Sequence, residues 1–232
     1  MSYHRIDLET YKRRDHFEHF LLMEDPFVNM TVQMEITSWF KRLKEKGDPF
    51  FLCFQYAVAK AANRIVEFRQ RIQEQGIVEF DVCGVSYTVA LPDGTYRYCN
   101  LNVDQALDAY IEEGKRKQAI ALQTEHLEEE GDPLGLFFIS CLPWTSYESL
   151  EMPHPNRYFS NPSITWGKYH MEKKLMLENG RVVEKEIVEI PVTVLVNHAL
   201  VDGIHLGMFY TNLEEELEKM FKEKEDAEVS QY

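Results

Sequence analysis

The chain is organised around the stretch Ile187-Val-Glu-Ile-Pro-Val-Thr-Val-Leu-Val-Asn197, which runs directly into His198-Ala-Leu-Val-Asp-Gly203. Its nearly continuous apolar character predicts a strand that is buried on both faces. An imidazole at the end of such a strand is held rigidly, and histidine is the side chain whose ordinary proton affinity suits both taking and returning a proton near neutral pH. His198 is therefore a candidate general base. The alternative is a hydrogen-bonded structural histidine, because base catalysis also needs positioned partners.

Outward from this strand, hydrophobic periodicity predicts a mixture of strands and helices. The expected strands cover 27–36, 77–80, 85–90, 95–101, 136–142, 164–176 and 183–196, the last of which contains most of this stretch, and 77–101 is expected to form a small meander. The expected helices cover 8–20, 39–46 with Thr37 or Ser38 as its cap, 50–65, one or two surface helices within 103–130, and 204–224. Strands and helices mixed without strict alternation predict an α+β fold with a mixed β-sheet covered by helices. We expect one domain over 1–232, ending in an acidic tail at about 222–232.

Composition excludes several classes of protein. The chain has 232 residues, 44% of them hydrophobic, which suffices for a substantial core. No apolar run approaches the ~20 residues of a membrane helix, and the N-terminus lacks the apolar segment of a signal peptide, so we expect a cytoplasmic protein. The formal charge of −14 repels polyanions and argues against general binding to nucleic acid or to an anionic membrane.

Two local groups of side chains bear on metal and phosphate binding. The four cysteines show no paired ligand spacing, so we expect reduced thiols and no metal. Lys168, Lys173 and Lys174 are a candidate cluster for a phosphorylated cofactor, since local cations are needed to outweigh the acidic field. The alternative is a solvated lysine face.

Several motifs along the chain resemble the chloramphenicol acetyltransferases. The motifs are Phe138-Ile-Ser140-Cys-Leu-Pro-Trp144, Thr165-Trp-Gly-Lys-Tyr169, Asn197-His198-Ala-Leu-Val-Asp202-Gly203-Ile-His-Leu-Gly207, Arg13-Arg14-Asp15-His16-Phe17-Glu18, Glu67-Phe68-Arg69 and Tyr87-Thr88-Val89. They occur in the family's order, so the resemblance extends from about residue 5 to about 222. It implies the coenzyme A-dependent acyltransferase fold and a homotrimer with active sites between subunits.

The resemblance also implies a reaction, the transfer of acetyl from acetyl-CoA to a hydroxyl of chloramphenicol, and through it antibiotic resistance. His198 matches the histidine that removes the proton of the attacking hydroxyl and then protonates the departing thiolate. A positioned base typically contributes ~10²–10⁴-fold, and no acetyl-enzyme is needed. Ser140 matches the serine that meets the oxyanion, and Thr165 the threonine that positions a water beside it.

The same resemblance assigns supporting and binding residues. Asp202 and Arg13 match a pair that fixes the active-site turn. Trp144 and Tyr169 match coenzyme A contacts, although each could equally be plain core. The other histidines, among them His205, match no catalytic position and are expected to be structural or at the surface.

Departures from the family pattern concern the acceptor. Asn197 stands where a second histidine is common. Phe20 stands where a tyrosine often touches chloramphenicol and Tyr98 where a phenylalanine is usual, and the loop 151–157 is altered. The loss of one phenolic hydrogen bond costs ~0.5–1.5 kcal/mol, which weakens binding without abolishing turnover. Two rivals therefore remain, a related acyl-CoA acyltransferase for another small alcohol and a non-catalytic trimeric binding protein. The dihydrolipoamide acyltransferases share the His-x-x-x-Asp-Gly motif, but no lipoyl domain or linker supports that assignment.

Overall fold

A computed structural model describes residues 2–74, 76–124, 127, 132–178 and 180–229. The helices are α1 (Arg14–Leu21), α2 (Thr37–Lys46), α3 (Phe50–Asn63), α4 (Leu107–Ala121) and α5 (Gly203–Val229), with short 3₁₀ turns η1 (Glu67–Arg69) and η2 (Pro133–Gly135). The strands are β1 (Tyr3–Ile6), β2 (Phe27–Glu35), β3 (Gln70–Gln73), β4 (Gly76–Phe80), β5 (Gly84–Ala90), β6 (Tyr96–Leu101), β7 (Leu136–Leu142), β8 (Ser163–Gly167), β9 (His170–Glu178) and β10 (Arg181–Asn197).

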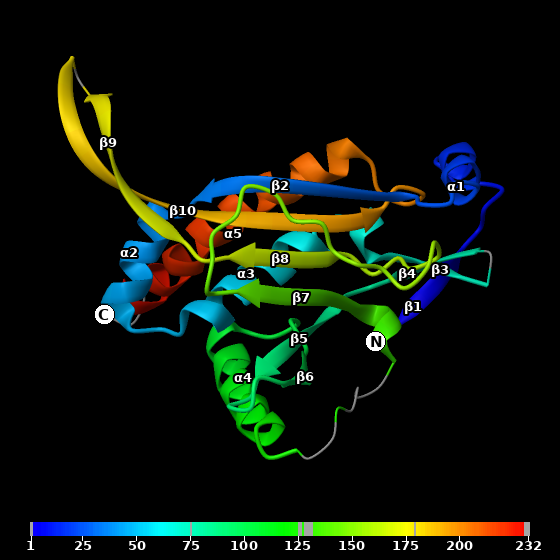
Figure 1. The fold of residues 1–232 in the computed structure, drawn as a ribbon, viewed down its shortest axis with the longest axis horizontal. Helices are drawn as coiled ribbons and strands as arrows, with labels where there is room; N and C mark the ends of the chain where they lie inside the picture. Colours follow the sequence, from blue (N-terminus) through cyan, green and yellow to red (C-terminus); the bar gives the residue numbers. More distant parts are fainter. Residues whose placement is uncertain (1, 75, 125–126, 128–131, 179, 230–232) are drawn as a thin grey trace.

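The main sheet is centred on β10, the strand expected from the apolar stretch. Its order is β2-β10-β8-β7-β5-β6, and β9 pairs with the first half of β10. The β7 strand runs parallel to both β5 and β8, and the other pairings are antiparallel. The second half of β10 is buried on both faces between β2 and β8. The predicted mixed sheet is confirmed (Figure 1).

The helices supply the cover for this sheet. Rings of α3 contact the sheet at Trp166, whose centroid lies 5.1 Å from Phe54 and 5.6 Å from Phe51. On α5, Tyr210 donates a hydrogen bond to the carbonyls of Met30 and Val192, which fixes that helix against β2 and β10. Figure 1 shows α3 and α5 behind the sheet and α4 beside β6. The predicted α+β class is thereby confirmed.

A second, three-stranded sheet of order β1-β4-β3 lies beside the main one. The prediction of a meander over 77–101 is therefore wrong. The β4 strand pairs with β1 and β3, whereas β5 and β6 form a hairpin in the main sheet. The reason lies in the turn after Phe80. There, Arg69 donates to the carbonyls of Phe80 and Asp81, and Asn63 accepts the N–H of Cys83 and donates to its carbonyl, so these side chains turn the chain from one sheet into the other.

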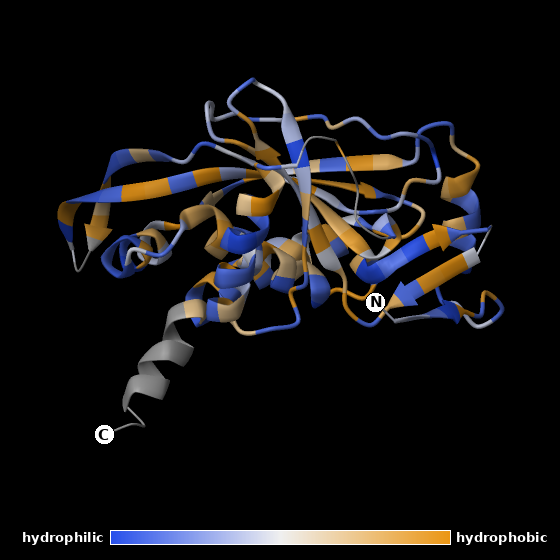
Figure 2. Ribbon diagram, turned by 90° about the horizontal axis from the view of Figure 1, so that it is seen from below, coloured by the Kyte–Doolittle hydropathy of each residue, from blue (hydrophilic) through white to orange (hydrophobic). Residues whose placement is uncertain are grey.

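The β9–β10 hairpin extends beyond the main sheet as a two-stranded arm. The expected strand 164–176 is in fact two strands, β8 and β9, separated where the Lys168 N–H bonds the Thr145 carbonyl. Hydrophilic and hydrophobic residues alternate along the arm (Figure 2). Leu175, Leu177 and Val182 leave large apolar side chains exposed there.

Helix boundaries depart from expectation at several points. The first helix begins at Arg14 rather than Leu8, because Asp7 accepts the N–H of Glu9 and the hydroxyl of Thr10 bonds the Asp7 carbonyl, which makes a turn of this segment. Thr37 does not cap α2, since its hydroxyl accepts the N–H of Val188 instead. The expected helices within 103–130 are represented by α4, and part of that range lies outside the described residues.

The expected acidic tail at 222–232 belongs to α5 as far as Val229 and lies outside the described residues beyond it. Within the ranges described, no helix combines the length and the apolar composition needed to cross a membrane.

Candidate active site

His198 occupies a tight turn between β10 and α5. Its N–H bonds the Pro26 carbonyl at 2.7 Å, and the N–H groups of Leu200 and Val201 both reach the Asn197 carbonyl at 3.0 Å. The ring Nδ1 lies 3.0 Å from the Val201 carbonyl oxygen. A carbonyl only accepts hydrogen bonds, so Nδ1 carries the proton of the neutral ring and Nε2 keeps its lone pair. The side chain is 30% exposed, so this lone pair belongs to a group that solvent reaches.

Asp202 and Arg13 form an ion pair beside this turn. Two guanidinium nitrogens of Arg13 bond the two carboxylate oxygens of Asp202. These bonds hold the pKa of Asp202 below its ordinary value of 3.8. The Asp202 Oδ1 also lies 3.2 Å from His198 Nδ1, which adds a second acceptor on the side of the ring that carries the proton.

Phe20 covers one face of the imidazole. The two ring centroids are 3.9 Å apart, and the planes are inclined by 15°. This stacking adds to the hydrogen bond at Nδ1 in limiting rotation of the His198 ring. The structure therefore places Phe20 against the candidate base of its own chain and not beside Tyr98.

Ser140 and Thr165 lie side by side on the parallel strands β7 and β8. Together with Tyr98 and Met152 they line a cavity of about 430 Å³. The Thr165 hydroxyl donates to Met152 Sδ at 2.8 Å, so a residue of the altered loop 151–157 holds its rotamer. The cavity thus combines two hydroxyl groups with an aromatic wall and apolar side chains.

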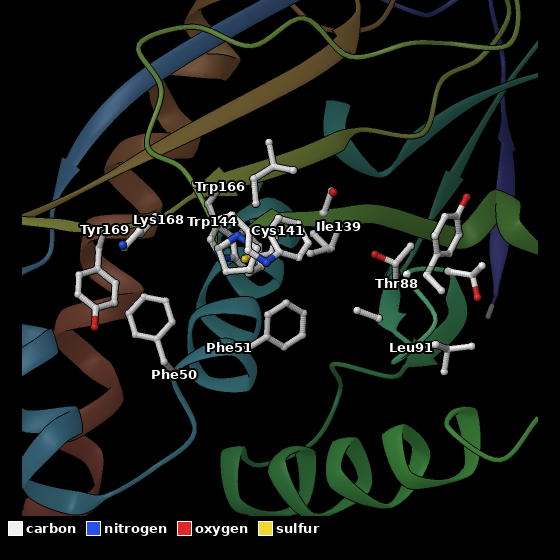
Figure 3. A pocket seen from close by; sticks show the side chains of 18 residues that line it. Phe50, Phe51, Thr88, Leu91, Ile139, Cys141, Trp144, Trp166, Lys168 and Tyr169 are labelled. Carbon is white, nitrogen blue, oxygen red and sulfur yellow. The ribbon is translucent and has the colours of Figure 1, made fainter.

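Trp144 and Tyr169 line a larger groove of about 810 Å³ next to this cavity. Figure 3 shows Lys168, Tyr169 and Phe50 toward one end of the groove and Thr88 and Leu91 toward the other. Trp144 is 75% exposed, and Tyr169 packs against the rings of Phe40 and Phe50. Four residues line both spaces, so the groove and the cavity adjoin there: Thr88, Ile139, Ser140 and Leu142.

The base and the two hydroxyls are not brought together within one chain. Thr193 of β10 is level with Thr165 of β8, which is level with Ser140 of β7. His198 lies five residues farther along from Thr193, which at ~3.3 Å per residue separates it from that level by roughly 16 Å. One chain therefore carries two half-sites, which we call the base half (His198, Asp202, Arg13, Phe20) and the hydroxyl half (Ser140, Thr165, Tyr98).

The expected lysine cluster is dispersed. Lys168 lines the groove, whereas Lys173 pairs with Glu184 at 2.7 Å and Lys174 with Glu172 and Glu189 at 2.7 and 3.1 Å. Neighbouring residues of a strand point to opposite faces, which separates Lys173 from Lys174.

One group in the described part of the chain has metal-ligand spacing. His170, Glu172 and Glu189 place their ligand atoms within 4.8 Å of one another on the arm. The ammonium of Lys174 already pairs with both glutamates and competes with a cation there.

Two further residues beside the base half hold its backbone in place, and no role in the site was predicted for either of them. Asn197 is buried, donates to the carbonyls of Arg157 and Phe159 at 2.9 and 3.0 Å, and accepts the N–H of Ala199. His205 accepts the N–H of Asp202 at 2.9 Å. For Asn197 the available signal was its type, since Asn favours such local bonds where a strand ends. His205 offered no signal beyond its spacing.

Comparison with known proteins identifies the family to which the chain is similar. The family model described as chloramphenicol acetyltransferase matches residues 1–214. An Escherichia coli protein named chloramphenicol acetyltransferase is 28% identical, over 92% of this chain and 93% of its own. A solved structure named chloramphenicol acetyltransferase superposes with a TM-score of 0.73 at 26% identity, covering 93% of this chain and all of its own. A probable dihydrolipoamide acetyltransferase of Listeria monocytogenes shares the fold, with a TM-score of 0.63 at 17% identity over 94% of this chain and 95% of its own.

The fold and these matches define an acetyl-CoA-dependent acetyltransferase. Because the family model covers most of its length, the chain belongs to the chloramphenicol acetyltransferase family.

Proposed function

We propose that this enzyme transfers acetyl from acetyl-CoA to a hydroxyl of chloramphenicol, with His198 as general base and acid. The observation that carries the proposal is the fixed His198 ring. Its Nδ1 is 3.0 Å from a carbonyl, which leaves Nε2 as the proton acceptor.

The active site is completed between copies of the chain in a homotrimer. Roughly 16 Å separates the level of His198 from that of Ser140 and Thr165, so the base of one copy serves the hydroxyl half of its neighbour. Assembly of the two halves is supported by the exposure of His198 and by the open cavity beside Ser140.

The reaction proceeds by direct transfer. His198 Nε2 takes the proton of the acceptor hydroxyl as its oxygen attacks the thioester carbonyl, and a tetrahedral intermediate forms. The Ser140 hydroxyl donates to the oxyanion, and Thr165 positions a water beside it. When the carbon–sulfur bond breaks, the imidazolium returns its proton to the thiolate, so one residue acts first as base and then as acid. Holding both substrates together provides much of the remaining acceleration.

Binding of the two substrates divides between the two spaces. The groove with Trp144, Tyr169 and Lys168 suits coenzyme A, because it offers aromatic surfaces and one cation within an acidic protein. The smaller cavity, with Tyr98 in its wall, suits the acceptor, and Phe20 of the neighbouring copy closes it beside the base.

The second candidate function is acetylation of another small alcohol. Phe20 lacks the phenolic hydroxyl that often contacts chloramphenicol, and the Thr165 hydroxyl already donates its hydrogen bond to Met152 Sδ. A thiol-release assay with acetyl-CoA and a panel of small alcohols decides between them. We expect turnover with chloramphenicol. If only another alcohol is acetylated, that alcohol is the acceptor in place of chloramphenicol. If no alcohol is acetylated, the protein is a non-catalytic binding protein of the same fold.

A further inference from the structure

His205 lies in the first turn of α5 with its side chain only 12% exposed. Its Nδ1 accepts the N–H of Asp202 at 2.9 Å, and its Nε2 lies 3.5 Å from Glu67 Oε1. A nitrogen that accepts a hydrogen bond carries no proton, so the ring is neutral and its proton is on Nε2, facing Glu67. The Glu67 carboxylate thus favours the tautomer that leaves Nδ1 free to accept.

The N–H that His205 holds belongs to the same peptide group as the carbonyl that His198 contacts. The carbonyl of Val201 lies 3.0 Å from His198 Nδ1, and the N–H of Asp202 bonds His205 Nδ1. A peptide group is planar, so fixing its N–H fixes the direction of its C=O. The peptide group between Val201 and Asp202 therefore contacts one imidazole at each end.

We propose that His205 is a positioning residue for His198, acting through the peptide plane between Val201 and Asp202, with Glu67 setting the His205 tautomer. The hydrogen bond at each end of a peptide group polarises the group and strengthens the bond at the other end. His205 thereby helps to keep the His198 proton on Nδ1 and the lone pair on Nε2. Its importance for turnover rests on the proposed role of His198 as base.

Proton uptake by His205 would break this chain of bonds. Three charged groups face the ring, namely Glu67 on η1, Arg13 ahead of α1, and Asp202. Burial lowers the pKa of His205 below its ordinary 6.5, although Glu67 opposes this effect. A lowered histidine pKa means that the native state resists protonation, so its contribution to stability is complete above pH 6.5 and is lost as the pH falls through the lowered value.

Two amide substitutions distinguish the effect of the hydrogen bond to the Asp202 N–H from the effect of side-chain volume at position 205. In His205→Asn the amide oxygen takes the place of Nδ1 and does not titrate, whereas in His205→Gln the amide reaches the place of Nε2 and leaves the Asp202 N–H without its acceptor. We expect His205→Gln to lower kcat about tenfold with KM little changed, and His205→Asn to restore most of it. His170→Gln, on the arm, controls for the substitution itself.

The ¹⁵N shifts of the His198 ring report its tautomer without any turnover, so this test stands even if the acceptor is wrong. We expect a single Nδ1–H tautomer in the wild type and in His205→Asn, and a mixture of tautomers in His205→Gln. We also expect the acid limb of the kcat–pH profile to move in His205→Gln. An unchanged tautomer and pH profile in His205→Gln, or equal losses in the Asn and Gln variants, would overturn the proposal.

Discussion

At the scale of single residues, the base half depends on a few short contacts around one ring. Nδ1 of His198 is bound to a backbone carbonyl, the Asp202 carboxylate stands beside it, and Phe20 covers one face. These contacts leave one position, Nε2, free for chemistry.

Replacing His198 by alanine removes the only group in the base half that we propose for proton transfer. We expect turnover to fall by several orders of magnitude, since a positioned base contributes ~10²–10⁴-fold and also prepares the nucleophile. Coenzyme A release measures the rate, and thermal unfolding together with sedimentation checks that the protein is intact and assembled. An alanine variant that keeps most of its activity would remove His198 from the mechanism.

Asp202→Asn leaves the Arg13 guanidinium partly buried without its charge partner. We expect a loss of roughly 1–3 kcal/mol in the free energy of unfolding at neutral pH, with a looser site and lower turnover. Because the pKa of Asp202 is lowered, the pair stabilises fully above 3.8 and its contribution disappears as the pH falls through the lowered value. Denaturant titrations at several pH values check this, since the difference between the two proteins must shrink in acid. A difference that persists there would speak against an ionic contribution.

At the scale of elements, the end of β10 is joined to the loop before β8 through Asn197. We expect Asn197→Ala to lower the free energy of unfolding by roughly 2–4 kcal/mol, because two partly buried carbonyls and one buried N–H lose their partner. Asn29→Ala, at an exposed position of the neighbouring strand β2, is the matched control and should change stability little. Urea unfolding measures both, and equal values would contradict this role for Asn197.

The helices and strands differ in how well they could be predicted from the sequence. The elements with strong periodicity, such as β2, α3 and β7, were predicted within a few residues, because burial of one face or both leaves its pattern in the sequence. The strands β1 and β3 were missed. They are four residues long, rich in polar side chains and paired through β4, so nothing local distinguishes them.

For the candidate site, the motifs named the residues of both halves, but their separation along β10 depends on strand register, which the motifs do not contain. His205 was expected only to be structural or at the surface, and its contact with the base half was not predicted for a related reason. Its role comes from a backbone N–H three residues earlier, and a backbone bond leaves no residue type to recognise.

At the scale of the whole molecule, we propose that the two half-sites of one chain face different neighbours. The base half lies at the end of β10, and the hydroxyl half lies level with the middle of that strand's paired segment. Each copy would then give its base to one neighbour and receive a base from the other, which a closed ring of three copies satisfies.

Mixing two inactive variants tests this claim most directly. His198→Ala and Ser140→Ala, each nearly inactive alone, are unfolded together in equal amounts, refolded, and assayed for coenzyme A release with chloramphenicol. Random assembly of a ring makes roughly one site in four from an intact base and an intact serine, so we expect about a quarter of the wild-type rate. A mixture no more active than its two components, although the copies have exchanged, would show that each chain completes its own site and would rule out a site shared between copies.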